Sequence, residues 1–118
     1  MKELLIVDDE MSVLRFLSAF LKSDQYCLKC ASSVDECIDL ISEEVKLIVT
    51  DYKMHQRLGT EIVDYTLENK LDCEVIMITG FDDVQISNDV RNRCLDVIQK
   101  PFEIDEFRNL VMKVMEEV

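Results

Sequence analysis

The feature that most restricts the fold of this chain is a series of short apolar runs that recur along it. Each run is too short for a typical helix, and its consecutive apolar residues are typical of strands buried on both faces. The clear runs cover residues 3–8, 46–51, 74–79 and 96–100, and a weaker one covers 26–31. Strands of this kind belong to a parallel sheet.

Between the runs, apolar residues recur at the spacing of amphipathic helices. The first and the last of these stripes are Val13, Phe16, Leu17, Phe20 and Leu21, and Ile104, Phe107, Leu110, Val111 and Val114. Leu14 lies at the margin of the first stripe. The stretch from Ser33 to Glu36 has the pattern of a capping box and predicts a helix that begins there. Two less apolar segments, at about 60–69 and 83–93, complete the set of predicted helices.

Five strands that alternate with five helices predict an α/β fold, in which helices cover both faces of a five-stranded parallel sheet. No linker or low-complexity tract interrupts the pattern, so we expect residues 1–118 to form one domain. Right-handed crossovers favour a three-layer, doubly wound (βα)5 arrangement. Such a sheet collects the carboxyl ends of its central strands at one edge, where ligands bind.

The charge balance restricts the partners of the chain. Twenty-five acidic and thirteen basic residues give a formal net charge of −12. This charge repels a phosphate backbone and argues against nucleic-acid binding by this segment. We expect cations and basic protein surfaces as partners instead.

The hydropathy pattern predicts a cytoplasmic protein without a membrane span. No apolar run approaches the roughly 20 residues of a transmembrane helix, and the N-terminus lacks the features of a secretory signal. The five cysteines lie in apolar segments, as reduced core thiols do. Cys27 and Cys30 match a C-x-x-C pattern, but on a strand they would face opposite sides, which argues against a redox pair.

Polar side chains end four of the five predicted strands. Asp8 and Asp9 end the first strand, Asp51 the third, Thr79 the fourth, and Lys100 follows the fifth. Taken singly, an acid pair is most often a helix cap, a threonine a strand end and a lysine a solvated charge. Because the carboxyl ends of parallel strands share one edge, we expect the five side chains to converge there as a site.

A site of this composition is suited to phosphoryl transfer. Three carboxylates repel one another unless a cation joins them. Oxygen ligands with positions left for water suit Mg²⁺, and Mn²⁺ could replace it. Asp51 would then attack a phosphoryl group, while the cation, Thr79 and Lys100 neutralise the phosphoryl oxygens.

Four motifs make the chain resemble the response-regulator receiver domain, the CheY-like family, over essentially its whole length. They are IVDDE, LIVTDYKM with Gly59 after it, VIMITG and VIQKPF. The resemblance implies the strand order 2-1-3-4-5, of which CheY is a standard example. It also implies that Asp51 is the phosphoacceptor, and that Asp8, Asp9, Asp51 and the backbone carbonyl of Lys53 bind the cation.

The resemblance assigns roles to further residues. Thr79 matches the switch hydroxyl, and Lys100 matches the lysine that bridges to the phosphoryl group. The bond between Lys100 and Pro101 matches one that is usually cis in the family. Lys53 and Phe81 match two variable positions beside the path of the hydrolytic water, and we expect these two side chains to slow autodephosphorylation.

Three places depart from the family pattern. Val97 stands where an aromatic residue usually turns inward on activation, which puts that aromatic switch in doubt. His55 stands where proline is usual, and we expect an exposed loop histidine. Arg93 and Cys94 replace the small pair that is common before the fifth strand.

The resemblance implies a function in two-component signalling. Asp51 would receive its phosphoryl group from a histidine kinase or a histidine phosphotransfer protein, and it would act as a stoichiometric phosphoacceptor rather than as an enzyme. The segment 81–93, the fifth strand and the last helix would then present an altered face to a downstream protein or an attached output domain. The chain could be a stand-alone receiver or a part of a longer regulator.

The main alternative function is a haloacid-dehalogenase-like phosphatase, which also uses an aspartyl phosphate. Its motif has a second aspartate two residues after the nucleophile, where this chain has Lys53. A flavodoxin-like electron carrier fits less well, because with two glycines the chain lacks a glycine-rich phosphate loop. A receiver fold with an unused site is a third alternative, against which the five polar residues argue.

Overall fold

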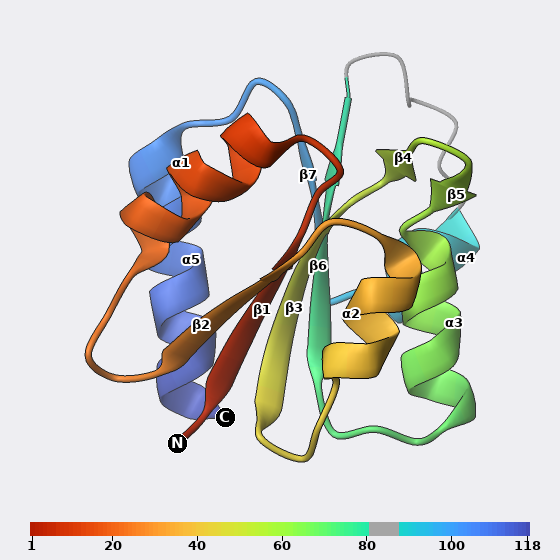
Figure 1. The fold of residues 1–118 in the computed structure, drawn as a ribbon, viewed down its shortest axis with the longest axis horizontal. Coiled ribbons are helices and arrows are strands. Elements are labelled where there is room, and N and C mark those ends of the chain that lie inside the picture. Colours follow the sequence, from red (N-terminus) through yellow and green to blue (C-terminus); the bar gives the residue numbers. More distant parts are fainter. Residues whose placement is uncertain (81–87) are drawn as a thin grey trace.

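The computed structural model describes residues 1–80 and 88–118, and its central feature is a five-stranded parallel sheet (Figure 1). The strands are β1 (Glu3–Val7), β2 (Cys27–Ala31), β3 (Val45–Asp51), β6 (Glu74–Thr79) and β7 (Asp96–Gln99). They lie in the order β2-β1-β3-β6-β7 and all pair in parallel, so the predicted order is confirmed. The strand bounds differ from the predicted ones by one residue at most.

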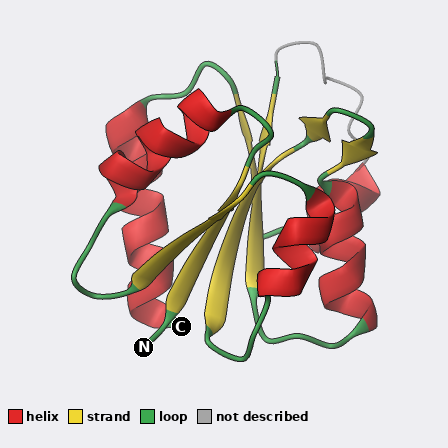
Figure 2. Ribbon diagram, in the orientation of Figure 1, coloured by secondary structure: helices red, strands yellow, loops and turns green. Residues whose placement is uncertain are grey.

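Helices cover both faces of the sheet, as the pattern predicts (Figure 2). One face carries α1 (Met11–Leu21) and α5 (Ile104–Glu117), and the other carries α2 (Val34–Leu40), α3 (Thr60–Glu68) and α4 (Asn88–Arg93). Alternate residues of β1 enter different cores. Leu4 and Ile6 pack with α1 and α5, whereas Leu5 and Val7 pack with α2 and α3. The central strands β1, β3 and β6 are therefore buried on both faces, which explains their apolar runs, whereas the edge strands β2 and β7 are only partly buried.

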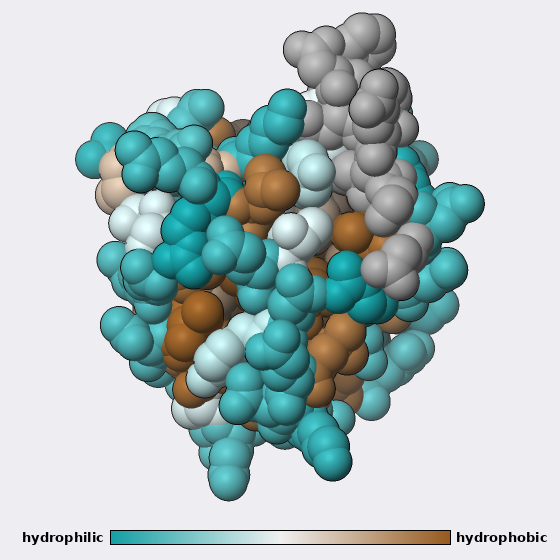
Figure 3. All heavy atoms as spheres, turned by 90° about the vertical axis from the view of Figure 1, so that its right-hand side faces the viewer, coloured by the Kyte–Doolittle hydropathy of each residue, from teal (hydrophilic) through white to brown (hydrophobic). Residues whose placement is uncertain are grey.

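The surface over α2 and α3 is mostly hydrophilic, with small apolar patches between the polar side chains (Figure 3). None of the helices in the described part of the chain is long and apolar enough to cross a membrane.

The buried face of α1 differs from the predicted one. The buried residues are Leu14, Leu17 and Leu21, whereas Phe16 is 55% exposed. Phe16 instead stacks on the partly buried Phe20, with the ring centroids 5.9 Å apart. The placement of Phe16 in the core and of Leu14 at its margin was wrong, because the apolar stripe is wide and the position of α5 decides which part of it faces inward.

The start of α2 confirms half of the predicted capping box. The Ser33 hydroxyl accepts a hydrogen bond from the backbone N–H of Glu36 (3.1 Å). The Glu36 carboxylate, however, accepts from the backbone N–H of Ser32 (3.1 Å) rather than from that of Ser33. The last helix buries Phe107, Val111 and Val114 as predicted, with Met115 in addition, and leaves Ile104 and Leu110 partly buried.

A short antiparallel hairpin, which the periodicity did not predict, lies between β3 and α3. Its strands are β4 (Lys53–Met54) and β5 (Arg57–Leu58). A strand of two residues is too short to show the alternation of apolar and polar side chains by which strands are predicted. The Arg57 guanidinium ties the hairpin to both neighbouring helices, because it pairs with Asp35 of α2 and with Glu61 of α3 (2.9 Å).

The structure also shows the Lys100–Pro101 peptide bond and the state of the cysteines. The Lys100–Pro101 peptide bond is cis, as expected. All five cysteines are free thiols. Cys37 is fully buried, and this burial raises the pKa of its thiol to about 12.

Candidate functional site

The structure brings three predicted carboxylates together at the carboxyl edge of the sheet. Asp8 and Asp9 follow β1, and Asp51 ends the adjacent strand β3. One oxygen from each of the three lies within 4.8 Å of the others. Asp8 is buried, and the Asp51 side chain is only 15% exposed. This donor set fits a divalent cation that prefers oxygen ligands.

Lys100 lies beside the acids. Its Nζ is 3.7 Å from Oδ1 of Asp51. Its backbone N–H donates to the carbonyl of Thr79 at 2.8 Å, which anchors the start of the loop after β7 to the end of β6. Thr79 is buried and follows Ile78, the residue that pairs with Asp51 in the sheet. The strand ends thus place the Lys100 ammonium beside Asp51 and bring Thr79 to the same edge of the sheet.

The pKa of Asp51 is raised from its ordinary value of 3.8 to about 6. Burial is the main cause, and the charges of Asp8 and Asp9 add to it. The Lys100 charge and the Tyr52 backbone N–H, which donates to Oδ1 at 3.1 Å, act in the opposite direction. The pKa of Asp8 is also raised, mainly by burial. A bound cation would relieve this accumulation of buried negative charge.

Close backbone packing supports the end of β3. A Cβ atom added to Gly59 would lie 2.3 Å from the carbonyl oxygen of Asp51. Gly59 also donates its N–H to the Tyr52 carbonyl (2.7 Å), and Tyr52 donates to the carbonyl of Ile78 (2.8 Å). The chain after Asp51 therefore folds back onto the strand end, and only glycine fits at position 59.

His55 contacts Asp9 of the acid cluster, a contact that no pattern in the sequence predicted. Its Nδ1 lies 2.9 Å from Oδ2 of Asp9, and its backbone N–H donates to the same oxygen at 2.8 Å. The side chain is 79% exposed, so the expectation of an exposed loop histidine is confirmed. Asp9 and His55 are 46 positions apart, so no helical or strand spacing in the sequence relates them, and only the tertiary fold brings them together.

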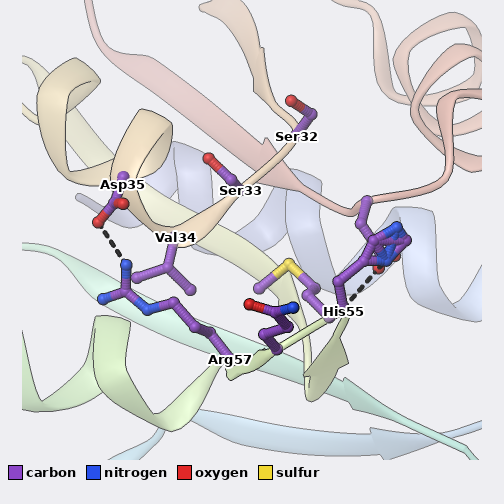
Figure 4. A pocket seen from close by; sticks show the side chains of 9 residues that line it. Ser32, Ser33, Val34, Asp35, His55 and Arg57 are labelled. Atoms are coloured by element: carbon purple, nitrogen blue, oxygen red, sulfur yellow. Dashed lines mark hydrogen bonds and ion pairs between the residues drawn. The ribbon is translucent and has the colours of Figure 1, made fainter.

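A hollow of about 380 Å³ opens beside Asp9 and His55 (Figure 4). Val34 and Met54 are its buried apolar residues. The remaining lining residues are Asp9, Ser32, Ser33, Asp35, His55, Gln56 and Arg57. Figure 4 shows His55 at one end of the hollow and the Arg57–Asp35 ion pair at the other.

The other predicted site residues have different outcomes. Lys53 begins β4, and the role of its carbonyl as a cation ligand stays a prediction. Val97 is partly buried in β7 opposite Met77, on the side of the α2–α3 core. Phe81 lies outside the described residues. Arg93 of α4 forms an ion pair with Asp64 of α3.

Comparison with known proteins gives relatives along the whole chain. Residues 4–112 match the response regulator receiver domain family. The chain is 29% identical over 117 residues to the response regulator SaeR of Staphylococcus aureus (strain USA300). That alignment covers 97% of this chain and 49% of SaeR, so the chain spans about half the length of the curated relatives it matches.

Solved structures agree with the fold. The solution structure of the beryllofluoride-activated NtrC4 receiver domain dimer is 32% identical, covers 99% of this chain and 98% of that chain, and has a TM-score of 0.83. The signal receiver domain of a putative Luxo repressor protein from Vibrio parahaemolyticus is 20% identical, with coverages of 98% and 91% and a TM-score of 0.87. These matches give no support to the phosphatase alternative. Since the family match covers nearly the whole chain and the sheet has the family's strand order, the chain belongs to the response regulator receiver domain family of two-component signalling proteins.

Proposed function

We propose that residues 1–118 form one receiver domain that accepts a phosphoryl group on Asp51 with the help of Mg²⁺. The observation that carries the proposal is the position of the Asp51 carboxylate, which ends a buried strand between two other carboxylates and the Lys100 ammonium. Receiver domains bind Mg²⁺ at an acidic pocket of this kind. Mn²⁺ has the same preference for oxygen ligands and could substitute.

The residues of the cluster would hold the cation. Asp8, Asp9 and Asp51 supply carboxylate oxygens, and the Lys53 backbone carbonyl completes the share of the protein. The cation would supply positive charge to the phosphoryl oxygens and lower the mutual repulsion of the acids.

Asp51 is the nucleophile of the proposed transfer. One of its oxygens attacks phosphorus, a new oxygen–phosphorus bond forms, and the phosphorus–nitrogen bond to the donor histidine breaks, leaving its electron pair on the imidazole. The buried strand end holds the attacking oxygen in place. The Lys100 ammonium, already 3.7 Å from Asp51, neutralises charge on the transferred group.

Thr79 would carry the signal away from the site, and Val97 bears on how the signal is passed on. The Thr79 hydroxyl donates a hydrogen bond to the new phosphoryl group, which biases the loop after β6 toward a second conformation. Val97 lacks the aromatic ring that would usually follow this movement, so the usual aromatic rotation cannot pass the signal on at this position. Lys53 and Phe81 would restrict the hydrolytic water and slow loss of the phosphoryl group.

The partners follow from this role. A histidine kinase or a histidine phosphotransfer protein is the donor, and a downstream protein or an attached output domain receives the signal. The domain would act as a stoichiometric phosphoacceptor that catalyses its own phosphorylation and dephosphorylation.

Intact mass spectrometry after incubation with acetyl phosphate and Mg²⁺ tests the proposal. The parent should gain one phosphoryl group, and Asp51→Asn or chelation of Mg²⁺ should prevent the gain. Asp39→Asn, which changes an exposed carboxylate on α2, is the matched control and should behave as the parent does. Phosphorylation of Asp51→Asn at the parent's level, or steady-state hydrolysis of small phosphoesters, would contradict the assignment.

A further inference from the structure

The only histidine of the chain lies at the rim of the proposed cation site. It belongs to the turn of the β4–β5 hairpin and lies at one end of the hollow in Figure 4, where its imidazole contacts Asp9. Oδ2 of Asp9 already accepts the backbone N–H of His55 at 2.8 Å. The backbone of the turn is therefore tied to Asp9 independently of the imidazole, whose Nδ1 makes a second contact with the same oxygen at 2.9 Å.

The spacing of these two atoms suits neighbouring ligands of one metal ion. Ligand atoms at roughly 2.0–2.1 Å from an octahedral cation lie about 3 Å from their neighbours. Nδ1 of His55 and Oδ2 of Asp9 have this separation. The imidazole adjoins the three-acid cluster through Asp9 alone and is not one of the groups whose ligand atoms lie within 4.8 Å of one another. Its ring, which is 79% exposed, would therefore have to turn toward the cluster to share a cation with Asp9.

We propose that His55 is a nitrogen ligand of the cation bound by Asp9, and that it shifts the preference of the site from Mg²⁺ toward transition metals such as Co²⁺ and Ni²⁺. Imidazole binds these ions well and Mg²⁺ poorly, whereas carboxylates alone suit Mg²⁺ and Mn²⁺. The inference rests on the proposed function, because it assumes a cation at the acid cluster.

Metal affinities of tag-free protein test the inference. Dissociation constants for Mg²⁺ and Co²⁺ are measured by calorimetry for the parent, for His55→Ala and for Gln56→Ala. We expect His55→Ala to weaken Co²⁺ binding by roughly tenfold or more, the size of effect that loss of even a supporting contact produces, while Mg²⁺ binding changes much less. Gln56→Ala, the exposed neighbour in the same turn, should leave both affinities unchanged. The parent and both variants have the same five cysteines, so any Co²⁺ binding by thiols is common to all three. The difference in Co²⁺ affinity between the parent and His55→Ala therefore reports the imidazole.

Pulsed electron paramagnetic resonance of the Mn²⁺-loaded protein gives an independent readout. Because the chain has one histidine, an imidazole nitrogen coupling in the parent can come only from His55, and it should vanish in His55→Ala. The inference alone would be overturned if the parent binds Mg²⁺, the Mn²⁺-loaded parent shows no imidazole nitrogen coupling, and His55→Ala has the same ratio of Co²⁺ to Mg²⁺ affinity as the parent. Failure of the parent to bind any of these cations would overturn the proposed function as well.

Discussion

The carbonyl oxygen of Asp51 lies 2.3 Å from the position that a Cβ atom on Gly59 would occupy. The backbone of Gly59 is helical, with φ −58°, so the glycine is required by space rather than by an unusual backbone angle. The packing of position 59 is thus coupled directly to the position of the proposed phosphoacceptor.

Gly59→Ala should therefore disturb both stability and the site. The new methyl group would force the start of α3 away from the end of β3, because the opposing atom is backbone. We expect the free energy of unfolding to fall by about 1–3 kcal/mol in urea titrations, together with weaker Mg²⁺ binding. Gln56→Ala in the preceding hairpin is the control, and equal stability of the two variants would show that the close approach is not limiting.

Asp51→Asn should stabilise the cation-free protein in a pH-dependent way. The pKa of Asp51 is raised from 3.8 to about 6, so the folded state holds the proton more tightly than the unfolded state. The stability contributed by this group is full below pH 4 and is lost as the pH rises through about 6. The variant should gain at most about 3 kcal/mol over the parent at pH 7 and progressively less toward pH 5.

Urea unfolding of chelator-treated protein measures this difference. Addition of Mg²⁺ should stabilise the parent more than Asp51→Asn, because the variant lacks one ligand. A stability gain that does not change between pH 5 and 7 would mean that ionisation of Asp51 is not its cause.

Lys100→Met should raise the pKa of Asp51 further. The Lys100 charge lies 3.7 Å from the carboxylate and lowers its pKa, whereas methionine fills similar space without charge. Carboxyl ¹³C NMR titration of cation-free protein would follow the change. Lys113→Met, at an exposed position of α5, should leave the titration unaltered. An unchanged Asp51 midpoint in Lys100→Met would exclude the electrostatic coupling.

The corrected face of α1 predicts a contrast between neighbouring positions. Leu17→Ala removes a side chain that is 3% exposed and should lower the free energy of unfolding by about 2–5 kcal/mol. Phe16→Ala removes a larger side chain that is 55% exposed and should cost about 1 kcal/mol or less. Thermal or urea unfolding compares the two, and a larger loss for Phe16→Ala would restore the face predicted from periodicity.

Much of the fold was predictable because burial leaves a direct mark on a chain of this type. A strand covered on both faces is apolar along its buried length, and β6, with Val75 to Ile78 buried, accordingly begins and ends at the predicted residues. The same argument predicted the acid cluster, since parallel strands end at one edge and their last residues must meet there. The face of α1 was less predictable, because a wide apolar stripe fits more than one rotation of a helix.

The sequence by itself determined the strands, their parallel order through the family motifs, and the acids and lysine that end them, because these depend on local periodicity and on the polarity of a parallel sheet. Only the tertiary structure decided that Gly59 packs against the Asp51 carbonyl and that His55 reaches Asp9. Both contacts depend on the path of a loop between elements. A loop has no periodic burial that its sequence could display, so its contacts are set by where the folded strands and helices leave its two ends.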